Sequence, residues 1–162
     1  MNLLVLGIGN TLLSDEGVGI HVLEALRPHY GNDPTVELVD GGTLSFSLAP
    51  VIEDASALIV VDAAQIKAVP GTVAVFEGEA MDRFLIGNRK QSVHEVGLTD
   101  LMSIARLAGH WPVRRALIGI QPERLDWGEA PTPAVATAIP AAVERVDALI
   151  ARWRTEADDG AR

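Results

Sequence analysis

The chain has 162 residues, with 13 Lys and Arg against 22 Asp and Glu, no cysteine, and 48% hydrophobic residues. This length predicts one compact domain that needs neither disulfides nor a structural metal to fold, and the lack of cysteine excludes Cys-ligated zinc, iron–sulfur clusters and thiol catalysis. The formal net charge of −9 argues against a nucleic-acid partner, because binding to phosphates requires clustered Lys and Arg.

Neither a targeting segment nor a membrane span is expected from the sequence. The apolar stretch Leu3–Leu6 is broken by Gly7 and no basic residue precedes it, so it fits a buried strand better than a signal peptide. No run approaches the roughly 20 apolar residues that cross a bilayer. We therefore expect a cytoplasmic protein without a membrane partner. The acidic residues are unevenly placed, with 12 acidic and two basic residues in 1–82 but 10 and 11 in 83–162.

Short apolar runs along the chain predict the strands of a sheet that is covered on both faces. The run Thr35–Val39 alternates more than the others and is a weaker candidate. In chain order the strand candidates are Leu3–Ile8, Thr35–Val39, Ala57–Val61, Val73–Phe76 and Ala116–Ile120.

Helical periodicity fills the gaps between these runs. The first apolar face consists of Val18, Val22, Leu23 and Leu26, and Pro28 is expected to end that helix. A second helix is predicted over Leu98–Ala108, with Gly109 as its stop.

The last helix is expected to begin with Thr132 as its cap and Pro133 at its first position, and to run past Trp153. Pro140 either kinks this helix or marks its true beginning. We expect a single domain over residues 1–155 and a flexible tail over residues 156–162.

Strands that alternate with helices predict a doubly wound, three-layer α/β domain with a twisted, mostly parallel five-stranded sheet and helices on both faces. Only nine residues separate Asp62 from Thr72, whereas a parallel crossover usually needs a dozen or more. The strand at about 72–77 should therefore run antiparallel.

The turn Gly7-Ile8-Gly9-Asn10 after the first strand invites a nucleotide-binding interpretation. In the G-x-G-x-x-G pattern, however, the third glycine would fall at Leu12. Asp15 and Glu16 would also repel a pyrophosphate at this helix N-terminus. We therefore disfavour a nucleotide site, and interpret Asp15 as an acid that favours the positive end of the helix dipole.

Glu16 has a second interpretation, because two other candidate ligands should lie near it. Asp62 ends an apolar strand at the carboxyl edge of the sheet, where open α/β sheets bind ligands, and His94 precedes the predicted helix at Leu98. Two carboxylates and one imidazole suit a cation such as nickel or zinc, with positions left open for a substrate. The remaining histidines, His21, His29 and His110, are expected to be ordinary satisfied polar residues.

Asp40-Gly41-Gly42-Thr43 follows the Thr35–Val39 run and admits two interpretations. It could be a tight turn in which Thr43 caps a helix, or Asp40 could be a functional carboxylate. The sequence contains no G-x-S-x-G or H-E-x-x-H pattern that would indicate another catalytic class.

These motifs together resemble the [NiFe]-hydrogenase maturation endopeptidases. The most specific block is Gly7–Gly19, and the weaker blocks follow in the order of the family: Asp40–Thr43, Val61–Ala63, Ser92–Gly97, Ile118–Pro122 and Trp127–Gly128.

The resemblance implies an endopeptidase that removes a C-terminal extension from the nickel-loaded precursor of the hydrogenase large subunit. In this family Glu16, Asp62 and His94 match the positions that contact the nickel, which the substrate carries and which zinc or cadmium can replace in vitro. Asp40 matches an aspartate associated with activity or substrate choice. We expect a monomer, because the precursor must reach an exposed cleft.

The catalytic type stays open at this point, between an aspartyl and a metal-assisted hydrolase. Asp40 or Asp62 would orient or deprotonate the attacking water. The main alternative is a non-proteolytic nickel-binding accessory protein that docks on the same precursor.

Overall fold

A mixed sheet forms the centre of the molecule. The computed structural model describes residues 1–43, 45–88 and 97–161, and within them five strands pair in the order β2-β1-β3-β5-β4. The strands are β1 (Leu3–Gly7), β2 (Val36–Asp40), β3 (Ala57–Ala63), β4 (Val73–Glu77) and β5 (Arg114–Ile120). Each predicted run lies in one of these strands, with ends that differ by one or two residues.

The strand directions confirm the predicted topology. β1 pairs in parallel with β2 and with β3, and β3 pairs in parallel with β5. β4 runs antiparallel to β5, with Val73 opposite Ile120. The short β3–β4 connection therefore reverses the chain at the edge of the sheet, as its length predicts.

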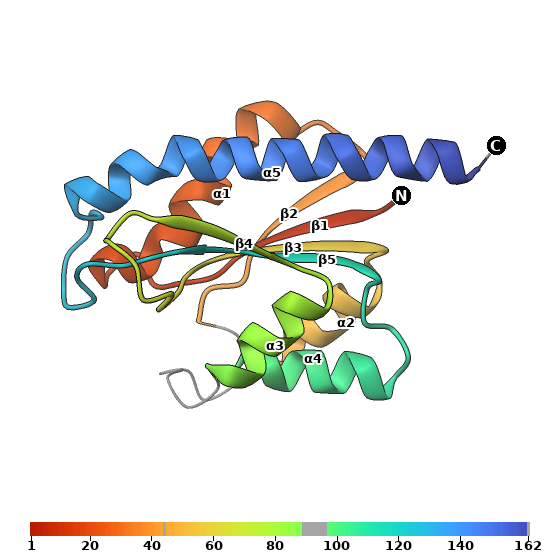
Figure 1. The fold of residues 1–162 in the computed structure, drawn as a ribbon, viewed down its shortest axis with the longest axis horizontal. Helices are drawn as coiled ribbons and strands as arrows, with labels where there is room; N and C mark the ends of the chain where they lie inside the picture. The colour runs from red at the N-terminus through yellow and green to blue at the C-terminus, as the bar shows by residue number, and fades with distance from the viewer. Residues whose placement is uncertain (44, 89–96, 162) are drawn as a thin grey trace.

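Helices cover both faces of the sheet (Figure 1). The helices are α1 (Val18–Tyr30), α2 (Ala49–Glu53), α3 (Glu79–Gly87), α4 (Leu98–Leu107) and α5 (Pro133–Gly160). On β3, Ile59 and Val61 join the core under α1 and α5, whereas Leu58 and Val60 join the core under α2, α3 and α4. This alternation explains why the strands are apolar at every position. The predicted α/β fold class is confirmed.

Helix α1 continues through Pro28, so the prediction that proline ends it was wrong. Tyr30 lies beyond the proline, packs against the core and donates a hydrogen bond of 2.7 Å to Asp147 of α5. This contact stabilises the last turn in a helical conformation that the proline alone disfavours.

Helix α5 begins as predicted, with Thr132 in the cap position and Pro133 at the first turn. Pro140 lies inside the helix, on its exposed side, and the helix continues through residues 156–160 of the expected tail. Within the described part of the chain, neither α5 nor any other helix is long and apolar enough to cross a membrane.

A buried ion pair joins α3 to β5 at the end of the sheet far from the carboxyl ends of the parallel strands. Arg115 donates to both carboxylate oxygens of Asp82, at 2.9 and 2.7 Å, and the Trp111 indole donates to the same carboxylate at 3.1 Å. Burial alone would raise the pKa of Asp82, but the bonds from Arg115 and Trp111 outweigh it and lower that pKa below its usual value.

Candidate functional site

The connection between β1 and α1 packs closely against its own chain and against the ends of two strands. Gly9 has a φ of +140°, and a Cβ at this position would lie 2.0 Å from the carbonyl oxygen of Glu16. A Cβ on Gly19 would lie 2.3 Å from the carbonyl oxygens of both Ile8 and Val61. The glycines therefore allow a close approach that brings Glu16 to the carboxyl ends of β1 and β3.

The backbone amides of this connection are already bonded within the protein. Ile8 N–H donates to the Val61 carbonyl at 3.0 Å, Gly9 N–H donates to the Gly42 carbonyl at 2.8 Å, and Asn10 N–H donates to the Glu16 carboxylate. A phosphate-binding loop needs such amides directed at the ligand. The glycine pattern is thus explained by close packing, and nothing in this loop supports nucleotide binding.

Glu16 and Asp62 lie together at the carboxyl ends of β1 and β3. Here the connection through α1 crosses one face of the sheet and the connection through α2 crosses the other face. β1 lies between β2 and β3, and α1 and α2 cover opposite faces of the sheet, which is the arrangement that creates a ligand crevice in α/β folds. Glu16 is only 7% exposed. Burial, and after it the negative charge of Glu16, raise the pKa of Asp62 well above its usual value.

Two neighbouring carboxylates, one buried and one partly buried, favour either a retained proton or a bound cation. A divalent cation would neutralise both charges, and carboxylate oxygens are suitable ligands for nickel or zinc. The described residues contain no group of three or more side chains placed to hold a metal. His94, the predicted third ligand, lies outside the described residues and stays a prediction.

Asp40 ends β2 and lies opposite Gly7 in the register, with its side chain exposed. Its Oδ1 accepts a hydrogen bond of 2.8 Å from Gly42 N–H, and Gly42 has a φ of +51°, so the predicted tight turn is present. Thr43 does not cap a helix in the structure, because Ser45 holds the cap position of the next helical turn.

The structure separates the two predicted catalytic carboxylates. Strand β1 lies between Asp40 and Asp62, which places their Cα atoms roughly 10 Å apart. Leu38 packs into the core under α1, so Asp40, two residues later, leaves the sheet on that same face. On this face the pKa of Arg27 is raised, mainly by Glu24 and to a smaller extent by the negative charge of Asp40. Asp62 follows the alternation of Val60 and leaves on the opposite face.

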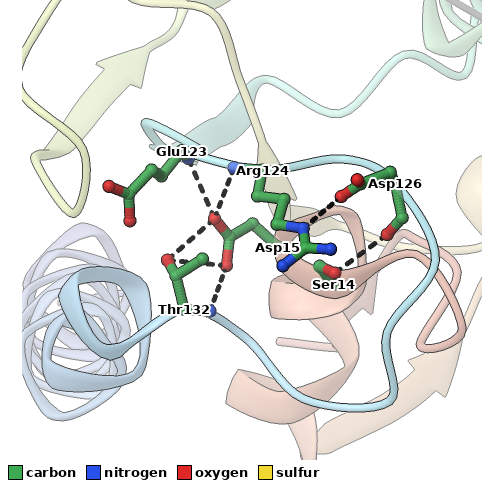
Figure 2. Close-up of polar contacts among 6 residues, drawn as sticks. All are labelled: Ser14, Asp15, Glu123, Arg124, Asp126 and Thr132. Atoms are coloured by element: carbon green, nitrogen blue, oxygen red, sulfur yellow. Dashed lines mark hydrogen bonds and ion pairs between the residues drawn. The ribbon is translucent and has the colours of Figure 1, made fainter.

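Asp15 makes contacts that the sequence did not predict. It lies in a short 3₁₀ helix, Ser14–Gly17, that precedes α1, and its side chain is fully buried. The carboxylate accepts bonds from the amides of Glu123 and Arg124, both at 2.9 Å, and from the amide of Thr132 at 2.6 Å, as Figure 2 shows. Asp15 does lie in a first helical turn, as the helix-dipole interpretation requires, but its hydrogen bonds join it to a loop distant in sequence.

The Thr132 hydroxyl also donates to Asp15, so this side chain does not cap α5. Burial alone would raise the pKa of Asp15, but the four donor groups in Glu123, Arg124 and Thr132 outweigh it and lower that pKa. The carboxylate is therefore charged near neutral pH and connects the two ends of loop 123–132.

Ser14 completes the connection between this loop and the site. Its φ is +51°, a conformation that disfavours a serine, and its amide donates to the Gly128 carbonyl at 2.8 Å while its hydroxyl donates to the Asp126 carbonyl at 2.8 Å (Figure 2). Loop 123–132 was missed as part of the site. The sequence did contain one indication of this loop, the short block Trp127–Gly128. In the structure a bridge pairs Gly128 of that block with Leu13 of the β1–α1 connection.

Two of the other histidines are at least half-exposed. His29 is half-exposed and its Nδ1 lies 3.7 Å from Asp147, and His110 is exposed. His21 differs from the expectation of a satisfied polar residue, since its buried Nε2 has no hydrogen-bond partner among the described residues.

The fold and the site define an α/β protein with paired acidic side chains, Glu16 and Asp62, at the carboxyl edge of its sheet. A family model described as hydrogenase maturation protease matches residues 20–148. The chain is 40% identical over 149 residues to the hydrogenase expression/formation protein HoxM of Cupriavidus necator, which covers 91% of this chain and 73% of that protein. It is 36% identical over 158 residues to the hydrogenase 2 maturation protease of Escherichia coli, which covers 97% and 95%.

The solved structures agree with the sequence matches. The hydrogenase maturating endopeptidase HybD of E. coli superimposes with a TM-score of 0.87 at 36% identity, covering 94% of this chain and 93% of that one. The chain belongs to the hydrogenase maturation protease family, and this membership makes it a peptidase. The family resemblance of the sequence motifs is confirmed.

Proposed function

We propose that this protein is an endopeptidase that removes the C-terminal extension from the nickel-loaded precursor of a [NiFe]-hydrogenase large subunit. The observation that carries the proposal is the pairing of Glu16 with Asp62 at the carboxyl edge of the sheet in a member of the maturation-protease family. The names of the relatives, which refer to hydrogenase formation and hydrogenase 2 maturation, support a hydrogenase precursor as the substrate.

In this proposal the nickel belongs to the substrate and serves as the recognition signal. Glu16 and Asp62 supply two oxygen ligands, His94 supplies a nitrogen, and the ligands of the precursor keep the remaining positions. A protein without cysteine offers no thiolate to compete for the metal. Zinc or cadmium in the precursor would bind the same three side chains in vitro.

The two predicted catalytic carboxylates then have different tasks. Asp62 lies beside Glu16, so it is the better placed of the two to orient or deprotonate a water near the metal-bound end of the substrate. Asp40 is exposed on the other side of β1, where it can contact the extension that is to be removed. Nickel held at the site would fix the adjoining peptide bond and polarise its carbonyl.

The proposal is tested by mixing the protein with nickel-loaded and nickel-free precursor and measuring the product masses. We expect the loaded precursor alone to be shortened, and equal cleavage of both would reject nickel recognition. Glu16→Gln and Asp62→Asn should abolish cleavage, whereas Asp54→Asn, at an exposed aspartate in the turn after α2, should not.

An accessory protein without protease activity predicts a different pattern. It would bind the loaded precursor through Glu16, Asp62 and His94, but no shortened subunit would form. Asp40→Ala separates the two functions further, because it should slow cleavage by a protease and leave nickel-dependent binding by an accessory protein unchanged.

A further inference from the structure

Two exposed apolar side chains lie opposite each other at the edge of the site. Trp127 is 75% exposed and Leu12 is 49% exposed. The Gly128 amide donates to the Leu12 carbonyl at 3.0 Å, and a parallel bridge pairs Leu13 with Gly128. This register places Leu12 across from Trp127 on neighbouring stretches of backbone. We call this pair the Leu12–Trp127 rim.

The backbone under the rim is rigidly connected. The buried Asp15 carboxylate bonds to both ends of loop 123–132, and the Ser14 hydroxyl bonds to its middle at Asp126 (Figure 2). The Ser14 amide also donates to the Gly128 carbonyl. A Cβ on Gly128 would lie 2.5 Å from the Ser14 hydroxyl, so the two segments are in close contact. Binding of a partner at the rim would therefore cost little backbone entropy in this loop, because the loop is already ordered.

The rim adjoins the proposed nickel-contacting residues. Leu12 and Glu16 belong to the same connection, and the Asn10 amide bonds to the Glu16 carboxylate. A chain that places its metal beside Glu16 approaches the same β1–α1 connection that carries Leu12. An exposed tryptophan on a preorganised loop is also a typical anchor of protein–protein interfaces.

The charges around Trp127 are mainly negative. The loop carries three exposed acidic side chains and a single basic side chain, Arg124, which is already paired with Asp126. The acidic residues are Glu123, Asp126 and Glu129. This balance favours a partner segment with basic side chains next to its apolar ones.

We propose that the Leu12–Trp127 rim is a docking surface for an extended segment of the precursor substrate that carries an apolar side chain flanked by Lys or Arg. This inference rests on the proposed function, because it assigns the occupant to the same precursor. The segment packs its apolar side chain against the indole and Leu12, while its basic groups face the acidic loop.

The test measures binding and cleavage of the loaded precursor by Trp127→Ala, Trp127→Phe and Leu12→Ser. The control is Leu107→Ser, because Leu107 is 91% exposed at the C-terminal end of α4, and α4 leads into the amino end of β5, away from the site. Trp127→Ala should raise Kd and KM by at least about tenfold with a smaller change in kcat, and added salt should weaken wild-type binding. Trp127→Phe should restore most of the affinity.

The outcomes separate this inference from the proposed function. If the wild type cleaves the precursor and Trp127→Ala has an unchanged KM, the docking surface is refuted and the protease stands. If the wild type binds without cleaving, and binding depends on Trp127 but not Leu107, the surface stands and the protease is refuted. A wild type that neither binds nor cleaves refutes both. Unchanged thermal melts show that the variants are folded.

Discussion

The buried carboxylate of Asp15 is the most direct point at which to test the structure. Asp15→Asn keeps the size and shape of the side chain but replaces one acceptor oxygen by an amide group that donates. In the native protein Oδ1 accepts from the Thr132 amide, and Oδ2 accepts from the amides of Glu123 and Arg124. In either orientation of the asparagine, at least one backbone donor faces another donor.

The cost follows from these contacts. An orphaned buried amide costs about 1–3 kcal/mol, and the surviving bonds weaken because their acceptor is no longer charged, which adds about 1 kcal/mol. We therefore expect Asp15→Asn to lower the free energy of unfolding by about 3 kcal/mol. For a chain of this length the same loss lowers Tm by about 6–12 °C.

Urea unfolding at neutral pH, followed by far-UV circular dichroism, measures this loss. The matched control is Asp54→Asn, which makes the same chemical change at an exposed position and should alter stability by less than about 0.5 kcal/mol. Hydrogen exchange at the amides of Thr132 and Arg124 should accelerate in the Asp15 variant. A loss below about 1 kcal/mol, or unchanged exchange at these amides, would refute the role assigned to Asp15.

Three further predictions concern the scaffold. Asp82→Ala removes the carboxylate that pairs with the partly buried Arg115, which keeps only its bonds to the Pro112 and Val113 carbonyls, and should cost about 2–3 kcal/mol in urea unfolding. Glu79→Gln, which breaks an exposed ion pair in the same helix, should cost less than about 1 kcal/mol. The pKa of Asp82 is lower in the folded protein than in the unfolded chain, where it is about 4. The charged carboxylate therefore stabilises the fold fully above about pH 4, and this stabilisation is lost as the pH falls through the folded-state pKa. Stability should therefore decrease more steeply with acidification in the wild type than in Asp82→Asn, and parallel curves would contradict the ion pair. Gly19→Ala should lower Tm strongly because its Cβ meets two carbonyl oxygens, while Gly87→Ala has open space and should raise stability by up to about 1 kcal/mol; equal Tm changes would contradict the close packing.

The sheet could be predicted because each strand and connection is marked by residues that are neighbours in the sequence. Apolar runs mark strands that are buried on both faces, and the nine residues between Asp62 and Thr72 are too few for a parallel crossover. Helix α2 was not predicted, because five residues carry little periodicity. Helix α3 was also missed, although its apolar residues do follow a helical pattern. The end of α1 was misplaced at Pro28, since the contact of Tyr30 with Asp147 joins segments distant in sequence.

The site could be predicted in part for similar reasons. The rule that ligands bind at the carboxyl edge of a parallel sheet selected Glu16 and Asp62, which the structure brings together. The same rule selected Asp40, but it does not say on which face of the sheet a side chain leaves its strand. It could therefore not predict that Asp40 and Asp62 lie on opposite faces. The role of Asp15 could not be read from its neighbours, because its partners lie 108 to 117 residues away along the chain.

This long separation has a consequence for biosynthesis. The acidic connection is made near the start of translation, but the amides that hold Asp15 appear only when Thr132 has been synthesised. Contacts of such high sequence separation form late in folding, because their loop-closure entropy must be overcome first. A nascent chain that has produced β1, α1 and β3 thus contains the paired acids without their supporting loop. Asp15 therefore gains the hydrogen bonds that hold the loop in place only when most of the protein has been made.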